Sequence, residues 1–294
     1  MVQRGAAVSE PPADEKTKAV ISARRFVRPV RLESGDGSDL REFIQARLNR
    51  ADEHIEELKR DFKSLQETDR QRIVPEMSAD MTEISIHVLY RRPHPNRRWA
   101  VIVGDIAHDL RSALDNAVYA IALTHSRTVL PPDNRRLAFP IADTEADWKR
   151  DKGRIRTLPE DARTLISDAQ PCHGGDALLS LLGHLNDMDK HRLPAVAAAG
   201  ILGGNLPTFN ERVGSYPNVT FLEGPAIGDA PLLRFTFAEP QPTKPEMDLR
   251  LSFQIYLLHE GHWLPAIQTL QQVRVVAEGT VRILEPFIGN PATP

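Results

Sequence analysis

The sequence predicts an α+β protein, mainly a helical bundle with a small antiparallel sheet. The first observation is a sustained spacing of apolar side chains every three or four positions in several segments, which is typical of amphipathic helices. The second is a strict alternation of apolar and polar residues in a few short runs, which is typical of half-buried strands. The sequence contains no internal repeat and no glycine-rich phosphate loop after a strand.

The composition is that of a globular protein. The chain has 294 residues, of which 41% are hydrophobic, so a large core can form and disorder is excluded. The 37 basic and 40 acidic side chains give a net charge of -3, so no global basic field attracts nucleic acid. No apolar run is long enough for a membrane helix, and the first residues lack the hydrophobic core of a signal peptide. We expect a cytoplasmic protein without membrane contact.

The chain divides into an arm and one domain. Residues 1–38 are rich in Pro, Gly and charge and lack periodicity, so we expect a flexible basic arm. Between Glu15 and Glu33 it holds six basic residues and no acidic one, which suits nucleic-acid phosphates but also a solvated tail or an edge strand. Residues 39–294 should form a single α+β domain, with a helical bundle over 39–195 and strands and a helix over 215–288.

The first helix of the bundle begins at Asp39, which forms a capping box with Glu42. Its apolar stripe continues to Leu65, and because the helix is long, part of the stripe could face a second subunit in a homodimer. Further helices are expected over 98–124, 145–152, 159–169, 176–191 and 265–284.

Strands are expected where apolar and polar residues alternate. One such run covers 84–90. Three later runs, over 219–222, 233–237 and 249–257, are grouped into one antiparallel sheet. Gly and Pro between residues 200 and 231 indicate connecting loops.

The segment from Gly104 to Tyr119 is the most distinctive in the chain. On a helix its apolar residues gather on one side, and a polar set gathers on the other: Asp105, His108, Asp109, Ser112, Asp115 and Asn116. Packing does not require such a face, so Asp105 and Asp109 are candidate binding residues that should face water or a cleft. The alternative is a solvated face with an Arg111–Asp115 pair at i, i+4.

This segment, GDIAHDLRSALDNAVY, resembles a motif close to G-D-x-x-H-N-L-R-S-A-L-D-H in a family of uncharacterised bacterial proteins. In that family the motif is followed by an F-P-I segment, here residues 139–141, and by a D-K-H-R segment, here 189–192. All three features occur in this order, so the resemblance covers residues 40 to 195. It indicates the family and is almost silent on function.

The family motif also resembles the R-x4-H signature of HEPN domains, which are helical bundles and in many cases metal-independent RNases. The resemblance implies that Arg111 would bind the scissile phosphate. Asn116 stands at the histidine position and cannot transfer a proton near neutral pH, although His108 could substitute by geometry. The catalytic candidates are Arg111, His108, Asn116 and Asp115.

A second polar stripe runs along the helix over 176–191 and comprises Ser180, His184, Asp187 and His191. Two imidazoles and a carboxylate could supply part of a Zn, Mn or Fe site, with His173 just upstream. His184 and His191 are two turns apart, about 10 Å, which is too far to share one metal. We therefore predict a solvated, metal-free face and no cofactor.

Several neighbouring residues complete the candidate sites. Asp189 should point to the leucine side of its helix and need a basic partner, with Arg111 the leading candidate. The single cysteine, Cys172, excludes disulfides and thiolate zinc sites, and beside His173 it has no identifiable third group for a thiol nucleophile. The binding candidates are Asp105, Asp109, His184, Asp187, Asp189, Lys190 and His191.

Two functions are compatible with these features. One is a bacterial interaction or ligand-binding module, HEPN-like and non-catalytic, whose polar faces bind RNA, a protein or a small ligand. The alternative is a metal-independent HEPN-type RNase of a toxin or defence system. A nuclease should leave Arg111 and a nearby histidine accessible in one cleft, whereas a module can cover or pair them.

Overall fold

The computed structural model describes residues 38–68, 72–89, 96–126, 136–191, 196–204, 208–209, 217–222, 231–243, 247–248 and 251–289. Apart from Ser38, the expected basic arm lies outside these residues, as does the acid-free run within it. The described part is α+β and mostly helical, with six α-helices, a four-stranded antiparallel sheet and a second, smaller sheet. Among the described helices, none combines the length and apolar character needed to cross a bilayer.

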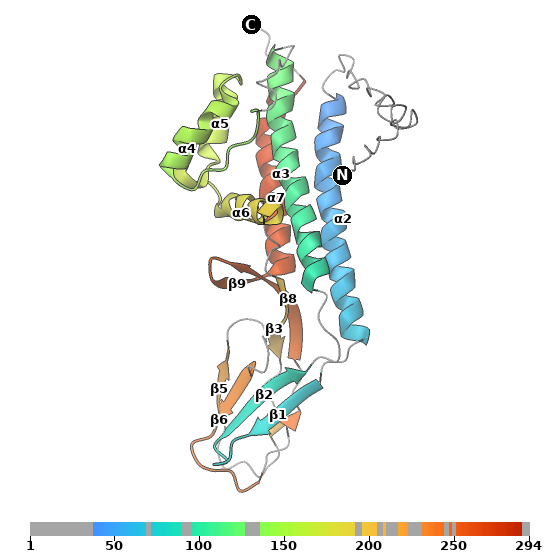
Figure 1. Cartoon of the computed structure of the whole chain (residues 1–294), viewed down its shortest axis with the longest axis vertical. Coiled ribbons are helices and arrows are strands. Elements are labelled where there is room, and N and C mark those ends of the chain that lie inside the picture. Colours follow the sequence, from blue (N-terminus) through green and yellow to red (C-terminus); the bar gives the residue numbers. More distant parts are fainter. Residues whose placement is uncertain are drawn as a thin grey trace, which may run out of the picture. The chain divides into compact units, whose positions relative to one another are not determined.

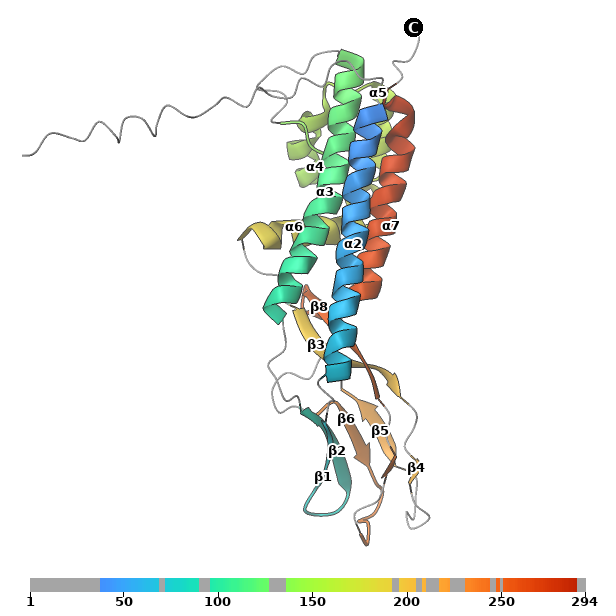
Figure 2. The ribbon, with the colours of Figure 1, turned by 90° about the vertical axis from the view of Figure 1, so that its right-hand side faces the viewer.

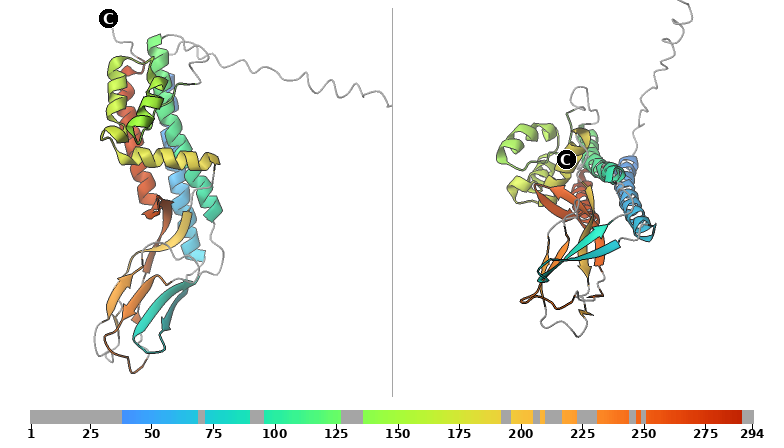
Figure 3. Two further views of the ribbon diagram at one scale, coloured as in Figure 1. Left: turned by 60° about the vertical axis from the view of Figure 1, so that its left-hand side comes forward. Right: turned by 60° about the horizontal axis from the view of Figure 1, so that its bottom comes forward.

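Three long helices lie side by side and form the bundle (Figures 1 and 2): α2 (Ser38–Thr68), α3 (Asn96–Ser126) and α7 (Ala266–Leu284). A fourth helix, α6 (Ala177–His191), crosses them and contacts both α3 and α7 (Figure 3). Two short helices, α4 (Glu145–Asp151) and α5 (Glu160–Asp168), follow the F-P-I segment, and α5 contacts α7. The sequence prediction of these six helices is confirmed to within a few residues at each end.

The apolar stripes of these helices meet in one core. On α2 the buried residues are those of the predicted stripe: Ile44, Leu48, Ala51, Ile55, Leu58 and Phe62. On α3 the predicted inner side is also buried: Ile106, Leu110, Ala113, Leu114, Ala117 and Val118. The helical phase derived from the spacing is therefore correct for both helices.

The four-stranded sheet has a small core of its own. Its strand order is β1 (Arg72–Met77), β2 (Glu83–Leu89), β6 (Leu233–Thr236) and β5 (Asn218–Phe221), with antiparallel pairing throughout. The predicted alternation in β2 and β6 places Ile84, Ile86, Leu233, Phe235 and Phe237 in this core. Strand β1 was not predicted, and its Pro75 is tolerated because β1 is an edge strand.

The second sheet corrects a prediction. Strand β8 (Leu251–His259) does not join β5 and β6; it pairs with β3 (Val196–Gly204) and β9 (His262–Pro265). A short ladder also joins β4 (Thr208–Phe209) to β7 (Met247–Asp248). The sequence VAAAGILGG of β3 lacks the alternation of a half-buried strand, and its glycines were interpreted as a loop. Pairing with the distant β8 makes it a strand.

Residues 259–262, with the sequence His-Glu-Gly-His, form the turn between β8 and β9. His259 pairs with His262, and the two residues between them, Glu260 and Gly261, have φ values of 49° and 83°. Two central residues with positive φ are typical of the type I′ turn that connects two-residue β-hairpins. The spacing of these histidines is thus explained by hairpin geometry.

Asp109 corrects a second prediction. Its side chain was expected to face water or a cleft, but the residue is only 5% exposed. Helix α2 covers this side of α3, and Arg47 Nη1 lies 2.8 Å from Asp109 Oδ1, while His54 Nε2 lies 3.7 Å from Oδ2. The angular position of Asp109 was correct, but a helical wheel cannot show that a second helix packs over its polar flank.

We expect Asp109→Asn to destabilise the protein because it removes the charge that faces Arg47 within the α2–α3 interface. The Arg47 side chain is 36% exposed, so the loss should be about 2 kcal/mol, below the range for fully buried pairs. Urea denaturation measures the effect. The matched control is Asp105→Asn, at an exposed position one turn earlier on α3, which should shift the stability by less than about 0.5 kcal/mol. Equal effects of the two variants would contradict the prediction.

Candidate anion-binding site

Arg111 and Asp115 hold the backbone of Phe139 from both sides. The Arg111 guanidinium donates a hydrogen bond to the carbonyl oxygen of Phe139, and Asp115 Oδ1 accepts one from the Phe139 N–H at 2.8 Å. The two side chains also pair with each other, with 3.1 Å between Arg111 Nη2 and Asp115 Oδ1. The predicted i, i+4 pair is confirmed, and the Arg111 side chain is only 13% exposed. We call these three residues the Phe139 clamp.

The segment after the clamp is fixed by a buried amide. Gln170 is fully buried; its Oε1 accepts from the N–H of Ala142 at 3.0 Å, and its Nε2 donates to the carbonyl of Ile166 at 2.8 Å. The ring of Phe139 is also fully buried. The F-P-I segment is therefore held by backbone hydrogen bonds near both ends and by an aromatic anchor. It gives α4 a rigid starting point.

Helix α4 begins with Thr144, whose hydroxyl accepts from the N–H of Asp147, and it leads directly into a 3-10 helix, η3 (Lys152–Ile155). Asp151 at the junction is buried and forms ion pairs with two arginines, with Arg150 Nη2 at 3.0 Å and Arg154 Nη2 at 3.1 Å. Just beyond, Ile155 and Leu158 enter the core. These buried residues fix a segment whose arginines point outward.

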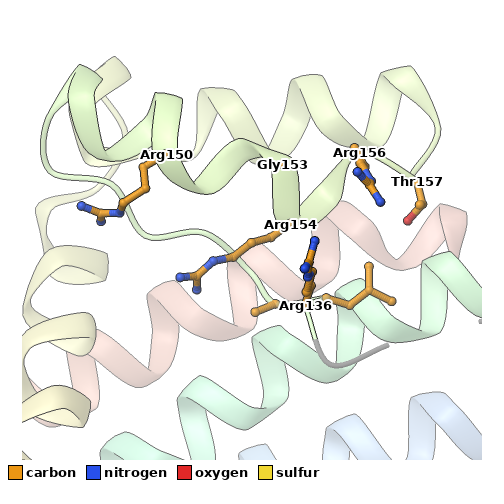
Figure 4. Close-up of a pocket in the computed structure, with 8 residues that line it drawn as sticks. Arg136, Arg150, Gly153, Arg154, Arg156 and Thr157 are labelled. Atoms are coloured by element: carbon orange, nitrogen blue, oxygen red, sulfur yellow. The ribbon is translucent and has the colours of Figure 1, made fainter. Parts of the chain in front are cut away.

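The arginines of this segment and the residues before Phe139 line a pocket of about 550 Å³ (Figure 4). The guanidinium of Arg136 is directed toward the segment that carries Arg154 and Arg156. The lining consists of Arg136, Leu137, Ala138, Arg150, Gly153, Arg154, Arg156 and Thr157.

The charged side chains that line the pocket are all arginines. Arg150 pairs with Asp147 and Asp151, and Arg154 pairs with Asp151. Four guanidinium groups thus line one pocket. Within the part of the chain that the structure describes, Arg136 has no acidic partner within 4.0 Å. Guanidinium groups bind phosphate and carboxylate oxygens through paired hydrogen bonds, so the pocket is suited to an anion.

The pocket offers little for chemistry. Its described lining has a single hydroxyl, on Thr157, and no histidine, cysteine or carboxylate that could act as a general base or nucleophile. The arrangement is suited to binding.

The polar face predicted on α3 does not gather into one site. Asp105 and His108 are exposed, Asn116 is half-buried, and the His108 Nε2 lies 3.5 Å from the hydroxyl of Ser112. The Arg111 side chain is turned to the carbonyl oxygen of Phe139.

The stripe on α6 is described in part. His184 and Asp187 are exposed, as predicted for a solvated face. The His184 ring packs edge-on against His259, with 4.8 Å between centroids. Burial, and secondarily the neighbouring His184, lower the pKa of His259. The side chains of Asp189, Lys190 and His191 lie outside the described residues, so the expected Asp189–Arg111 pair does too.

Sequence reasoning missed the arginine pocket. The signal was present in residues 149–156, KRDKGRIR, which hold five basic residues and one acidic residue. A short basic run is most often a solvated surface, and nothing in the sequence indicates that Arg136 joins it.

Comparisons with family models, with curated proteins and with solved structures give no match for this chain.

We expect Arg111→Ala to loosen the F-P-I segment, because it removes the hydrogen bond to the Phe139 carbonyl and leaves Asp115 without its arginine. Amide hydrogen exchange over residues 137–142 should accelerate, and the stability should fall by about 2 kcal/mol. His108→Ala, at an exposed position one turn earlier on α3, is the matched control and should change neither quantity. Unchanged exchange in Arg111→Ala would show that the clamp does not hold the segment.

Proposed function

We propose that this protein is a non-catalytic ligand-binding module that binds a phosphate-bearing small molecule in the arginine pocket. The observation that carries the proposal is the meeting of four guanidinium groups at one pocket of about 550 Å³. That volume is within the range of small-molecule sites, which is about 300 to 1,000 Å³. Because four guanidinium groups line the pocket and Arg136 has no acidic partner among the described residues, an anionic ligand complements the pocket.

The rest of the lining supports a phosphate ester over a bare inorganic ion. Leu137 and Ala138 provide apolar surface beside the guanidinium groups, and Thr157 provides a hydroxyl. A ligand with a charged group and a less polar body would use both kinds of surface. The nearby Phe139 clamp holds Leu137 and Ala138 in place, so binding would cost little conformational entropy at this wall of the pocket.

Two observations favour a binding role over the HEPN-type RNase of the sequence analysis. Arg111, the residue that would hold the scissile phosphate, is largely covered and engaged with Asp115 and Phe139. Asn116 stands where that mechanism needs a proton-transferring histidine. RNA as the ligand of the arginine pocket becomes an outcome of the experiments below.

The contacts also support the proposed family resemblance. The clamp joins the motif on α3 to the F-P-I segment, so two of the three features that define the resemblance meet in space. The arginine and the aspartate in the family-like stretch R-S-A-L-D are the residues that make these hydrogen bonds. We propose that the motif maintains the wall of the pocket.

We expect inorganic pyrophosphate to bind the full chain with one site and to bind Arg136→Gln at least tenfold more weakly. Arg136 is the best test because its removal breaks no ion pair among the described residues. Isothermal titration calorimetry measures the affinity. Lys149→Gln, in the basic run over residues 149–156 but outside the pocket lining, should bind like the wild type. Equal loss in both variants would indicate a general charge effect, and no binding to the wild type would refute the proposal.

We expect no cleavage of single-stranded RNA by the purified protein without added metal. Gel analysis of a labelled RNA, with Arg111→Ala and His108→Ala in parallel, tests this. Rapid cleavage abolished by Arg111→Ala would restore the RNase alternative, and a further requirement for His108 would identify the substitute base. RNA binding without cleavage that is lost in Arg136→Gln would instead make RNA the ligand of the pocket.

A further inference from the structure

A second cluster of functional side chains lies outside the arginine pocket. Glu145, Cys172 and His173 each offer one ligand atom, and these atoms all lie within 4.8 Å of one another. From this geometry we infer that the three residues form a binding site for a zinc ion. The inference is independent of the proposed function, because none of the three residues lines the arginine pocket.

The local fold is built to bring these residues together. Cys172 and His173 lie on a short 3-10 helix, η4 (Pro171–His173), which begins at a proline and ends at Gly174 with a φ of 89°. The next residue must also be small, because a Cβ on Gly175 would lie 2.2 Å from the carbonyl oxygen of Ala169. The N–H of Cys172 donates to the carbonyl of Ala142 at 3.0 Å, which holds η4 beside the segment leading to Glu145.

The orientation of His173 is the one that zinc-bound histidines adopt. Its Nδ1 lies 2.8 Å from the carbonyl oxygen of Ser167, which is an acceptor only, so Nδ1 carries a proton. Nε2 is thereby left to face Glu145 Oε2, at 3.1 Å. Histidine ligands of metals typically donate their second ring N–H to a backbone carbonyl or a carboxylate, which fixes the tautomer and the ring orientation. The ring also packs edge-on against Trp148, with 5.3 Å between centroids.

Acidic side chains lie near the thiol of Cys172. Burial, and then the charge of Glu145, raise the pKa of the Cys172 thiol, and Asp143 and Asp147 add to this effect. The hydrogen bond to Ser167, followed by that to Glu145, raises the pKa of His173. A divalent cation would bind Cys172 as the thiolate and His173 through an unprotonated Nε2, so metal binding would release any protons that these two atoms carry.

The ligand set favours zinc among the common metals. One thiolate, one imidazole and one carboxylate suit this borderline ion, whereas magnesium and calcium prefer oxygen ligands alone. Three protein ligands leave a fourth tetrahedral position for water or an added ligand. A single cysteine argues against a zinc site built from several thiolates, but a mixed site needs only one thiolate.

The test uses the full chain with Zn²⁺ or Co²⁺ added after chelator treatment. We expect one tightly bound zinc, and a cobalt complex with a thiolate-to-metal absorption band in the near ultraviolet. Cys172→Ser should lose that band, and His173→Gln and Glu145→Gln should each weaken zinc binding at least tenfold. The control is His184→Gln, an exposed histidine on the α6 stripe, which should bind zinc as the wild type does.

Circular dichroism shows whether each variant is folded, and Cys172→Ala provides a second cysteine variant should Cys172→Ser misfold. Zinc bound equally by Cys172→Ser, His173→Gln and the wild type, but lost in His184→Gln, would place the metal on α6 and overturn the inference. A wild-type protein that binds no zinc at micromolar concentration would overturn it as well. Pyrophosphate binding in the absence of metal should be the same in all of these variants.

Discussion

The burial of α3 constrains the rest of the structure, because every polar side chain on a covered face needs a partner within the protein. Helices α2, α6 and α7 all pack against α3, and a long run of its residues is excluded from solvent. Asp109 therefore faces Arg47 from α2, and Arg111 and Asp115 turn to the backbone of Phe139. The first contact fixes the neighbouring helix, and the second fixes the chain that follows α3. A helix that served only to pack against its neighbours would need neither of these two contacts.

The pocket depends on the contact of Arg111 and Asp115 with the backbone of Phe139, because this contact positions the neighbouring residues of the chain. Phe139 is held in place, so Leu137 and Ala138 directly before it form a fixed wall. Gln170 fixes Ala142 three residues later, and α4 then begins at a capped position. Asp151 ends α4 by pairing with Arg150 and Arg154, which orients arginines that would otherwise extend freely into water. A motif on a central helix thereby positions the wall of a pocket that it does not line.

The sequence predicts what local periodicity determines. The six helices and the buried sides of α2 and α3 follow from apolar spacing alone, since each stripe needs only a neighbour of some kind. The neighbour's identity is not local, so the sequence predicts solvent or a cleft around Asp109 and a loop at the glycines of β3. The candidate sites are less predictable still. Arg136 joins arginines 14 or more positions away, and Glu145 meets Cys172 across 27 positions of the sequence. Only the fold brings such residues together.

The charges around α4 have a simple structural explanation in part. Acidic residues in its first turn and basic residues in its last turn both complement the helix dipole, so Glu145, Asp147, Lys149 and Arg150 would stabilise this short helix without any ligand. That explanation does not extend beyond the helix. It gives no reason for Arg136 to face Arg154 and Arg156 across a pocket, or for His173 to present Nε2 beside a cysteine and a glutamate. Guanidinium groups gathered at one pocket are suited to an anion, and a thiolate, an imidazole and a carboxylate gathered at one point are suited to a zinc ion. The first proposed site therefore rests on Arg136, Arg154 and Arg156, and the second on Glu145, Cys172 and His173.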